Sequence, residues 1–237
     1  IVHFAAESHV DRSIDSSDEF IKSNINGTHS LLEAFKKCSR PSDKFIHVST
    51  DEVYGDLTES DPAFTESSPI KPSSPYAASK AASDLLCHSY FRTHKLPICI
   101  TRCSNNYGPN QFPEKLIPLM IQKALDGEKL PVYGDGMNIR DWIHVYDHCS
   151  AISTVLDRGQ PGEVYNIGGE CEVRNITLVR SILDELNVPH DMIEYVQDRK
   201  GHDWRYAMDN TKISSELGWN PVVGFQQGLQ SLIQSYK

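Results

Sequence analysis

Tyr76 and Lys80, four residues apart, carry the first chemical pattern in this chain of 237 residues. They follow the segment 72–75, Pro-Ser-Ser-Pro, and open a run of helical character, so both side chains lie on one helix face. An ammonium beside a phenol favours the phenolate, and we therefore expect Lys80 to lower the pKa of Tyr76. The pair would act as a general base, although the same spacing also occurs on ordinary surface helices.

Thr50, Asp51 and Glu52 form a second candidate group. They follow the apolar run 45–48, whose composition is typical of a short strand, so they stand at its carboxyl end. Two adjacent carboxyls can supply an acid and a base, and repulsion between their charges helps to push their pKa values apart. A solvated turn is the alternative interpretation. Together with the Tyr-Lys pair, the group would serve an oxidation coupled to an elimination.

Strands and helices alternate along the chain. Apolar runs predict strands at 1–6, 44–49, 96–101, 130–133 and 163–167. Helical spacing of apolar residues predicts helices at 17–37, 76–94, 114–126, 146–157, 176–186 and 225–236. Strands separated by helices of this length are typical of βαβ units, so the predicted fold class is α/β with a parallel sheet.

Polar residues follow three of the predicted strands, in the segments 6–9, 49–52 and 103–106. Ligands of open parallel sheets bind beyond the carboxyl ends of the strands, so these segments are expected to share one cleft. Three independent polar loops are the alternative. The sequence has 14 glycines but no G-x-G-x-x-G or G-x-x-G-x-x-G turn, so it predicts no phosphate loop between a first strand and helix.

Composition limits the class of partner. The formal net charge of −9, without a basic stripe, argues against nucleic acid. No apolar run approaches the roughly 20 residues that span a bilayer, so no membrane partner is expected. The six cysteines are scattered without a C-x-x-C pair, which predicts reduced thiols and a cytoplasmic location. The histidines lack metal-site spacing, so no metal is expected.

Longer motifs make the chain similar to a known family. Three of them resemble the extended short-chain dehydrogenase/reductases: His-Phe-Ala-Ala-Glu-Ser-His-Val-Asp-Arg-Ser at 3–13, Ser-Thr-Asp-Glu-Val-Tyr-Gly at 49–55, and Tyr-x-x-x-Lys at 76–80. Further segments extend the match to essentially the whole chain: 105–116, 136–142, 165–169 and 198–206. Within the family, the chain looks most like a nucleotide-sugar 4,6-dehydratase.

The resemblance implies a Rossmann-like doubly wound parallel sheet with a smaller α+β substrate-binding domain. Residues 1–105 would be the C-terminal part of the NAD-binding domain. Residues 106–237 would mainly bind the nucleotide-sugar, with 143–167 returning to the first domain. The Gly-rich turn of the family does not occur in this sequence, so we expect the N-terminus to be truncated. The family also pairs the helices at 17–37 and 76–94, which implies a homodimer.

The same resemblance implies a role for each catalytic candidate. Tyr76 would take the proton of the sugar O4 while NAD accepts hydride from C4, and Lys80 would hold the nicotinamide ribose. Thr50 would hydrogen-bond O4, Glu52 would remove the C5 proton, and Asp51 would protonate the leaving C6 hydroxyl. The product would be a 4-keto-6-deoxy sugar for deoxysugar biosynthesis, for example of rhamnose, with NAD regenerated.

Binding residues are implied in the same way. The cofactor NAD would meet Ala5, Ala6, Ser8, Ser23, Ser49, Tyr76, Lys80 and Asn106. The nucleotide-sugar would meet Ser8, Thr50, Asn105, Lys115, Leu116, Pro131, Val132, Tyr133, Arg140, Asn175, Asp198, Arg199 and His202. The Arg and Lys residues suit a diphosphate, because charge-assisted hydrogen bonds to phosphate are strong.

Two alternatives stay open at the level of sequence. A UDP-sugar dehydratase, epimerase or decarboxylase shares Tyr-x-x-x-Lys, but epimerisation at C4 needs no elimination pair such as Asp51 and Glu52. A non-catalytic nucleotide-binding fragment would not need the whole catalytic group. The choice between thymidine and uridine depends on one methyl group, which is worth only about 1–3 kcal/mol.

Overall fold

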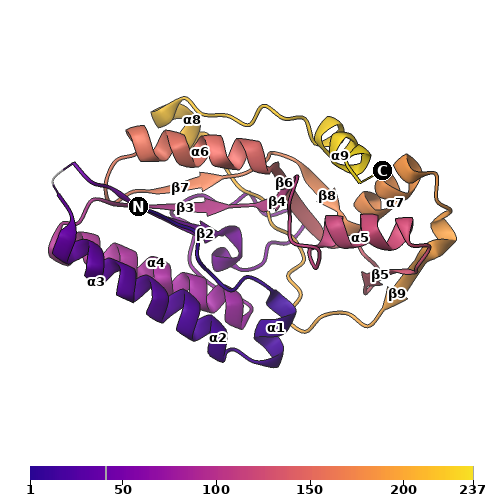
Figure 1. Ribbon diagram of the computed structural model, residues 1–237, viewed down its shortest axis with the longest axis horizontal. Coiled ribbons are helices and arrows are strands. Elements are labelled where there is room, and N and C mark those ends of the chain that lie inside the picture. Colours follow the sequence, from indigo (N-terminus) through magenta and orange to yellow (C-terminus); the bar gives the residue numbers. More distant parts are fainter. Residues whose placement is uncertain (41, 237) are drawn as a thin grey trace.

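A parallel four-stranded sheet lies at the centre of the computed structural model, which describes residues 1–40 and 42–236 (Figure 1). Its strands, in spatial order, are β1 (Val2–His3), β2 (Phe45–Thr50), β3 (Ile98–Cys103) and β7 (Val164–Ile167). The register between β2 and β3 places Thr50 beside Cys103 at the carboxyl end. Both strands are buried almost throughout, as expected for a parallel sheet covered on both faces.

Helices cover both faces of this sheet (Figure 1). One face carries α2 (Asp18–Phe20), the π-helical η1 (Ile21–Gly27), α3 (Thr28–Cys38) and α4 (Pro75–His94). The other face carries α6 (Val145–Arg158) and α8 (Thr211–Leu217). Each face has its own apolar cluster, so the sheet is held between two hydrophobic layers.

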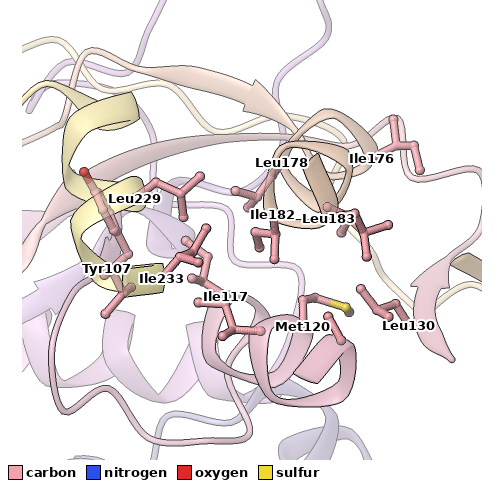
Figure 2. Close-up of a cluster of buried hydrophobic side chains, with 14 of the residues drawn as sticks. Tyr107, Ile117, Met120, Leu130, Ile176, Leu178, Ile182, Leu183, Leu229 and Ile233 are labelled. Carbon is pink, nitrogen blue, oxygen red and sulfur yellow. The ribbon is translucent and has the colours of Figure 1, made fainter. Parts of the chain in front are cut away.

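The later part of the chain forms a second, smaller group of elements around its own core. β4 (Asn105–Tyr107), β6 (Ile139–His144) and β8 (Glu172–Arg174) make one sheet, and β5 (Leu130–Tyr133) pairs with β9 (Ile193–Val196). The accompanying helices are α5 (Leu116–Leu125), α7 (Asn175–Leu186) and α9 (Phe225–Gln234). Ile117, Leu130 and Ile182 meet in this core (Figure 2).

Three short elements complete the chain: α1 (Val10–Asp15), the 3-10 turn η2 (Asp51–Tyr54) and the 3-10 turn η3 (His190–Met192). Gly55 ends η2 with φ +90°, and a Cβ there would lie 2.2 Å from the carbonyl oxygen of Lys71. Only glycine fits this turn, which bends the chain away from the sheet directly after the two carboxyls.

The α/β fold predicted from the sequence is confirmed, with two kinds of correction. The strand predicted at 1–6 is wrong in extent, because only Val2 and His3 pair with β2 and the chain then leaves the sheet at Phe4. Eight short elements had no prediction: α1, η2, β4, β6, β8, η3, β9 and α8. In β6, buried Arg140 and Asp141 interrupt the apolar pattern that marks a strand.

In the described part of the chain, no helix has both the length and the apolar character that crossing a bilayer requires.

Truncation of a core side chain should destabilise the second group of elements. Ile182 is fully buried, so Ile182→Ala is expected to lower the free energy of unfolding by about 2–5 kcal/mol through lost burial and a cavity. Val222 is 85% exposed, and Val222→Ala should stay within about 0.5 kcal/mol of the parent protein. Urea unfolding measures both, and equal effects of the two changes would contradict the core assignment.

Candidate active site

The N-terminus of α4 positions Tyr76 and Lys80. Ser74 caps the helix by accepting a hydrogen bond from the Ala77 amide at 3.1 Å, and Pro75 suits the first helical position. Lys80 Nζ donates a hydrogen bond to the carbonyl oxygen of Val48 at 2.7 Å. Because Val48 lies in β2, this bond ties α4 to the strand whose carboxyl end carries the acidic pair.

The turn η2 positions Thr50, Asp51 and Glu52 at that strand end. Thr50 caps the turn, since its Oγ1 accepts a hydrogen bond from the Glu52 amide at 3.3 Å. The same hydroxyl donates to Asp51 Oδ1 at 3.1 Å. Thr50 also lies close enough to Tyr76 to lower the pKa of its phenol. In the sequence, Tyr76 follows Glu52 by 24 residues and Thr50 by 26 residues. The fold therefore brings the acidic pair and the Tyr-Lys pair together.

The two neighbouring carboxyls have different surroundings. Burial raises the pKa of Asp51 well above its usual value, and the charges of Glu52 and Asp141 raise it further. Burial also raises the pKa of Glu52, but Arg140, Lys115 and Arg199 all lower it. The cations therefore face Glu52, whereas Asp51 is 2% exposed among other acids. This asymmetry favours a protonated Asp51 beside an ionised Glu52.

The predicted effect of Lys80 on Tyr76 is wrong. Burial raises the pKa of Tyr76 well above its usual value, and Glu52, Cys103 and Asp51 raise it further, while the nearby Thr50 side chain lowers it. Tyr76 is 8% exposed, so loss of hydration and the neighbouring acidic groups set the direction of the shift. The Lys80 ammonium itself is held by the Val48 carbonyl.

A cavity of about 400 Å³ opens next to Glu52. Most of the predicted substrate residues line it, and these are Ser8, Asn105, Lys115, Leu116, Pro131, Val132, Tyr133, Arg140, Asn175, Arg199 and His202. Two do not line it. Thr50 lies behind Glu52, and Asp198 supports the wall by hydrogen bonding to His202 Nδ1 at 2.7 Å.

Two cationic side chains of this cavity donate hydrogen bonds to neutral backbone carbonyl groups. Arg140 is 7% exposed, and its guanidinium donates to the carbonyl oxygens of Ile139 and Asp203 at 2.7 and 2.9 Å. Lys115 Nζ donates to the carbonyl oxygen of Ser8 at 2.6 Å. Neither side chain has an ion-pair partner within 4.0 Å among the described residues, so the cavity suits an anionic ligand.

Several cavity residues were missed by the sequence reasoning. Asp11 forms an ion pair with Arg199 at 2.5 Å and lies 188 residues away from it. Other unpredicted wall residues include Glu114, Trp142, Asp203 and Tyr206. These four and Asp11 fall inside the motif segments that carried the family resemblance, so those segments were the available signal for them, whereas Leu119, Met120 and Val179 lie outside the segments.

The predicted cofactor residues gather on the sheet side of the site. Asn106 Oδ1 is buried and has no hydrogen-bond partner within residues 1–40 and 42–236, so it is available to a ligand. Ser49 ends β2 next to Thr50, and Ser23 lies in η1. Ala5, Ala6 and Ser8 form the loop that follows β1. These groups and Lys80 fit the nicotinamide half of a dinucleotide at a strand end.

A buried network of hydrogen-bonded polar side chains, which the sequence did not predict, lies near Lys80. Arg102 Nε donates to Asp84 Oδ2 at 2.9 Å, and its Nη1 donates to the Tyr54 hydroxyl at 2.8 Å. His47 Nε2 lies 3.4 Å from Asp84 Oδ1. Burial lowers the pKa of Lys80, and Asp84, one turn along α4, raises it. The Asp84 carboxylate therefore favours the charged form of Lys80, although burial outweighs it and the net pKa is lowered.

The parallel sheet and the site at its carboxyl edge are those of a known family. The model of that family, described as GDP-mannose 4,6 dehydratase, matches residues 1–232, and the chain belongs to this family. A relative in Neisseria meningitidis serogroup B, a dTDP-glucose 4,6-dehydratase, is 54% identical over 254 residues. That alignment covers 100% of this chain and 72% of the relative.

Solved structures show the same similarity. DesIV from Streptomyces venezuelae, a dTDP-glucose 4,6-dehydratase with NAD and TYD bound, superposes with a TM-score of 0.97 at 51% identity, covering 100% of this chain and 72% of that chain. A UDP-glucuronic acid 4-epimerase from Bacillus cereus, in complex with UDP-glucuronic acid and NAD, gives 0.91 at 29% identity, covering 100% and 76%.

Loss of the Asp84 charge should destabilise the protein strongly. Asp84→Asn leaves the buried Arg102 guanidinium without its counter-charge, and breaking a buried pair in this way costs about 3–5 kcal/mol. The control is Glu19→Gln, which removes an exposed partner of Lys22 at 3.7 Å and should have no measurable effect. Urea unfolding compares the two, and an unchanged midpoint for Asp84→Asn would show that the pair is not needed.

Proposed function

We propose that this chain catalyses the 4,6-dehydration of dTDP-glucose to dTDP-4-keto-6-deoxyglucose, as a hydro-lyase of deoxysugar biosynthesis. The observation that carries this proposal is the acidic pair itself. Asp51 is buried beside other acids and Glu52 faces cations, which suits one carboxyl as acid and the other as base in an elimination. Epimerisation at C4 requires no such pair, which argues against that alternative.

In this proposal each side chain handles one proton. Tyr76 takes the proton from the sugar O4, and Thr50 orients O4 through its hydroxyl. Glu52 removes the C5 proton, which the new 4-keto group makes acidic, and Asp51 protonates the departing C6 hydroxyl to give water. Bound NAD would supply the hydride chemistry of the cycle, as acceptor of the C4 hydride and later as its donor to C6. Only Glu52 of this group lines the cavity, which suits its contact with the sugar ring.

NAD is proposed as the cofactor, as in the DesIV structure. Lys80 would hold the nicotinamide ribose, and Asn106, whose buried Oδ1 lacks a partner among the described residues, would bind the nicotinamide end. Ser49, Ser23, Ala5, Ala6 and Ser8 would complete that half of the cofactor site. We propose that the diphosphate of the nucleotide-sugar contacts Arg140, Lys115 and Arg199. Asn175 Oδ1 is also buried without a hydrogen-bond partner among the described residues, and it would contact the nucleoside.

The proposal includes two domains and a homodimer in the cytoplasm. Residues 1–105 and 143–167 would form the NAD-binding domain, since β7 is a strand of the four-stranded sheet and α6 packs on it. Most other elements after residue 105 share the second core, whereas α8 also packs on the four-stranded sheet. Exposed Leu85 on α4 supports a paired surface, and six free cysteines suit a reducing compartment. Light scattering that shows a monomer at micromolar concentration would contradict the dimer.

The direct assay uses the product of the complete gene with NAD and dTDP-glucose. The expected product is dTDP-4-keto-6-deoxyglucose, detected by the absorbance of the 4-keto sugar in alkali and by a mass loss of one water. A parallel assay with UDP-glucose compares the activity on a uridine nucleotide with the activity on a thymidine nucleotide. A product that keeps the mass of the substrate would identify an epimerase instead.

Glu52→Gln should separate oxidation from water loss. The variant keeps Tyr76, so dTDP-4-ketoglucose is expected to form on the enzyme, whereas steady-state dehydration falls by about 10²–10⁴-fold without the base. Tyr76→Phe should instead prevent formation of the 4-keto intermediate. Rapid quenching and mass spectrometry distinguish the two variants. Full dehydratase activity of Glu52→Gln would contradict the role of this residue.

The pH profile should depend on Arg140. Glu52 must be ionised to act as base, so kcat is lost as the pH falls through the pKa of Glu52. Because Arg140 lowers that pKa, Arg140→Met is expected to raise it and to move the acid limb of the kcat profile to higher pH. Arg180→Met, on the exposed face of α7, is the matched control. An unmoved acid limb would contradict the link between Arg140 and Glu52.

A further inference from the structure

Asp11, Tyr133 and Arg199 form a closed triangle of side chains in the cavity wall. Asp11 Oδ1 lies 2.5 Å from Arg199 Nε, and Arg199 Nη2 donates a hydrogen bond to Asp11 Oδ2 at 3.0 Å. The Tyr133 hydroxyl donates to the same carboxylate oxygen at 3.3 Å. On the third side, the guanidinium carbon of Arg199 lies 5.2 Å from the centroid of the Tyr133 ring. One carboxylate therefore holds both a cation and an aromatic ring.

The three residues differ in their suitability for direct contact with a nucleotide-sugar. All of them line the cavity. Arg199 and Tyr133 suit such a ligand, because a guanidinium binds phosphate and a phenol ring packs against flat groups. Asp11 is an anion and would repel the phosphates, so direct contact does not explain its position. Its two partners in the triangle point to an indirect role.

Asp11 lies on a helix that is anchored at its buried side. Ser13, also on α1, is 1% exposed, and its Oγ accepts a hydrogen bond from the Tyr76 amide at 3.1 Å. The same hydroxyl donates to the carbonyl oxygen of Val10 at 2.6 Å. These bonds join α1 to the beginning of α4, so the backbone that carries Asp11 is held against the NAD side of the site.

Arg199, in contrast, lies in a segment without helix or strand, residues 197–203. Close to Arg199, this segment is supported from within: Asp198 Oδ1 accepts a hydrogen bond from the Arg199 amide at 2.8 Å and contacts His202 Nδ1 at 2.7 Å. Neither contact orients the guanidinium. Within residues 1–40 and 42–236, Asp11 is its one ion-pair partner.

We propose that Asp11 is a positioning residue, which holds the Arg199 guanidinium in the orientation that binds the diphosphate of the nucleotide-sugar. The inference rests on the proposed function for the identity of this ligand. Asp11 engages Nε and Nη2, on one edge of the planar group. A guanidinium has five N–H donors, so the others can bind phosphate while Asp11 stays in place.

The orienting effect of Asp11 is expected to outweigh its repulsion of the ligand. A flexible arginine that becomes ordered only on binding weakens the affinity, whereas Asp11 orders this side chain beforehand. The pair is partly withdrawn from solvent, with Arg199 23% and Asp11 32% exposed, so it is better ordered than a pair on the open surface. The adjacent guanidinium also offsets the negative charge of Asp11. Loss of Asp11 should therefore weaken binding.

The test is calorimetric titration of the complete gene product, with NAD, by dTDP. Asp11→Ala is expected to raise the dissociation constant about 10-fold, because Arg199 loses its orientation. In turnover, the same variant should raise KM and leave kcat near the parent value. Asp15→Ala is the matched control and should change neither constant, since Asp15 is exposed on the same helix and does not line the cavity described above.

A second titration asks whether Asp11 acts through Arg199. Arg199→Met removes the guanidinium, and in this background Asp11→Ala should no longer weaken the binding of dTDP. An equal loss of affinity in both backgrounds would overturn the proposal, because Asp11 would then act independently of Arg199.

Two results in the parent background would also overturn the proposal. Tighter binding of dTDP by Asp11→Ala would make Asp11 a competitor of the phosphates, and an unchanged constant would show that Arg199 needs no partner. If the alanine variant does not fold, Asp11→Asn, which keeps the shape without the charge, decides by the same criteria. A parent protein that does not bind dTDP would instead overturn the proposed function, so the two failures are distinguishable.

Discussion

The hydrogen bond from Lys80 Nζ to the Val48 carbonyl is the contact on which the geometry of the site depends. It joins helix α4 to strand β2 close to the point where β2 ends. Tyr76 lies one helical turn before Lys80, and Thr50 lies two residues after Val48, so this single contact brings phenol and hydroxyl together. Burial lowers the pKa of this ammonium, and the Asp84 carboxylate, itself paired with Arg102, raises it.

The proposed elimination depends on the different surroundings of the adjacent carboxyl groups of Asp51 and Glu52. The main chain of η2 places Asp51 inward, with other acids, and Glu52 outward, where Arg140, Lys115 and Arg199 line the cavity. The same cations suit the diphosphate of a nucleotide-sugar. In the proposed mechanism, one set of positive charges would both hold an anionic substrate and keep Glu52 available as a base.

The sequence predicted those features that depend on near neighbours. The spacing of Tyr76 and Lys80 and the adjacency of Asp51 and Glu52 are local patterns, and the alternation of strands and helices is periodic. Contacts between distant segments were not predictable in this way. The Asp11–Arg199 ion pair joins residues 188 positions apart, and the upward pKa shift of Tyr76 depends on burial that spacing does not express.

The proposed mechanism requires Asp51 to be protonated at neutral pH while Glu52 is ionised. Infrared spectroscopy of the complete gene product measures this directly, because a protonated carboxyl has a carbonyl stretch that a carboxylate lacks. We predict a carboxylic acid band at pH 7 that disappears in Asp51→Asn and persists in Glu52→Gln. A band that disappears only in Glu52→Gln, or the absence of any band assignable to Asp51, would contradict the account.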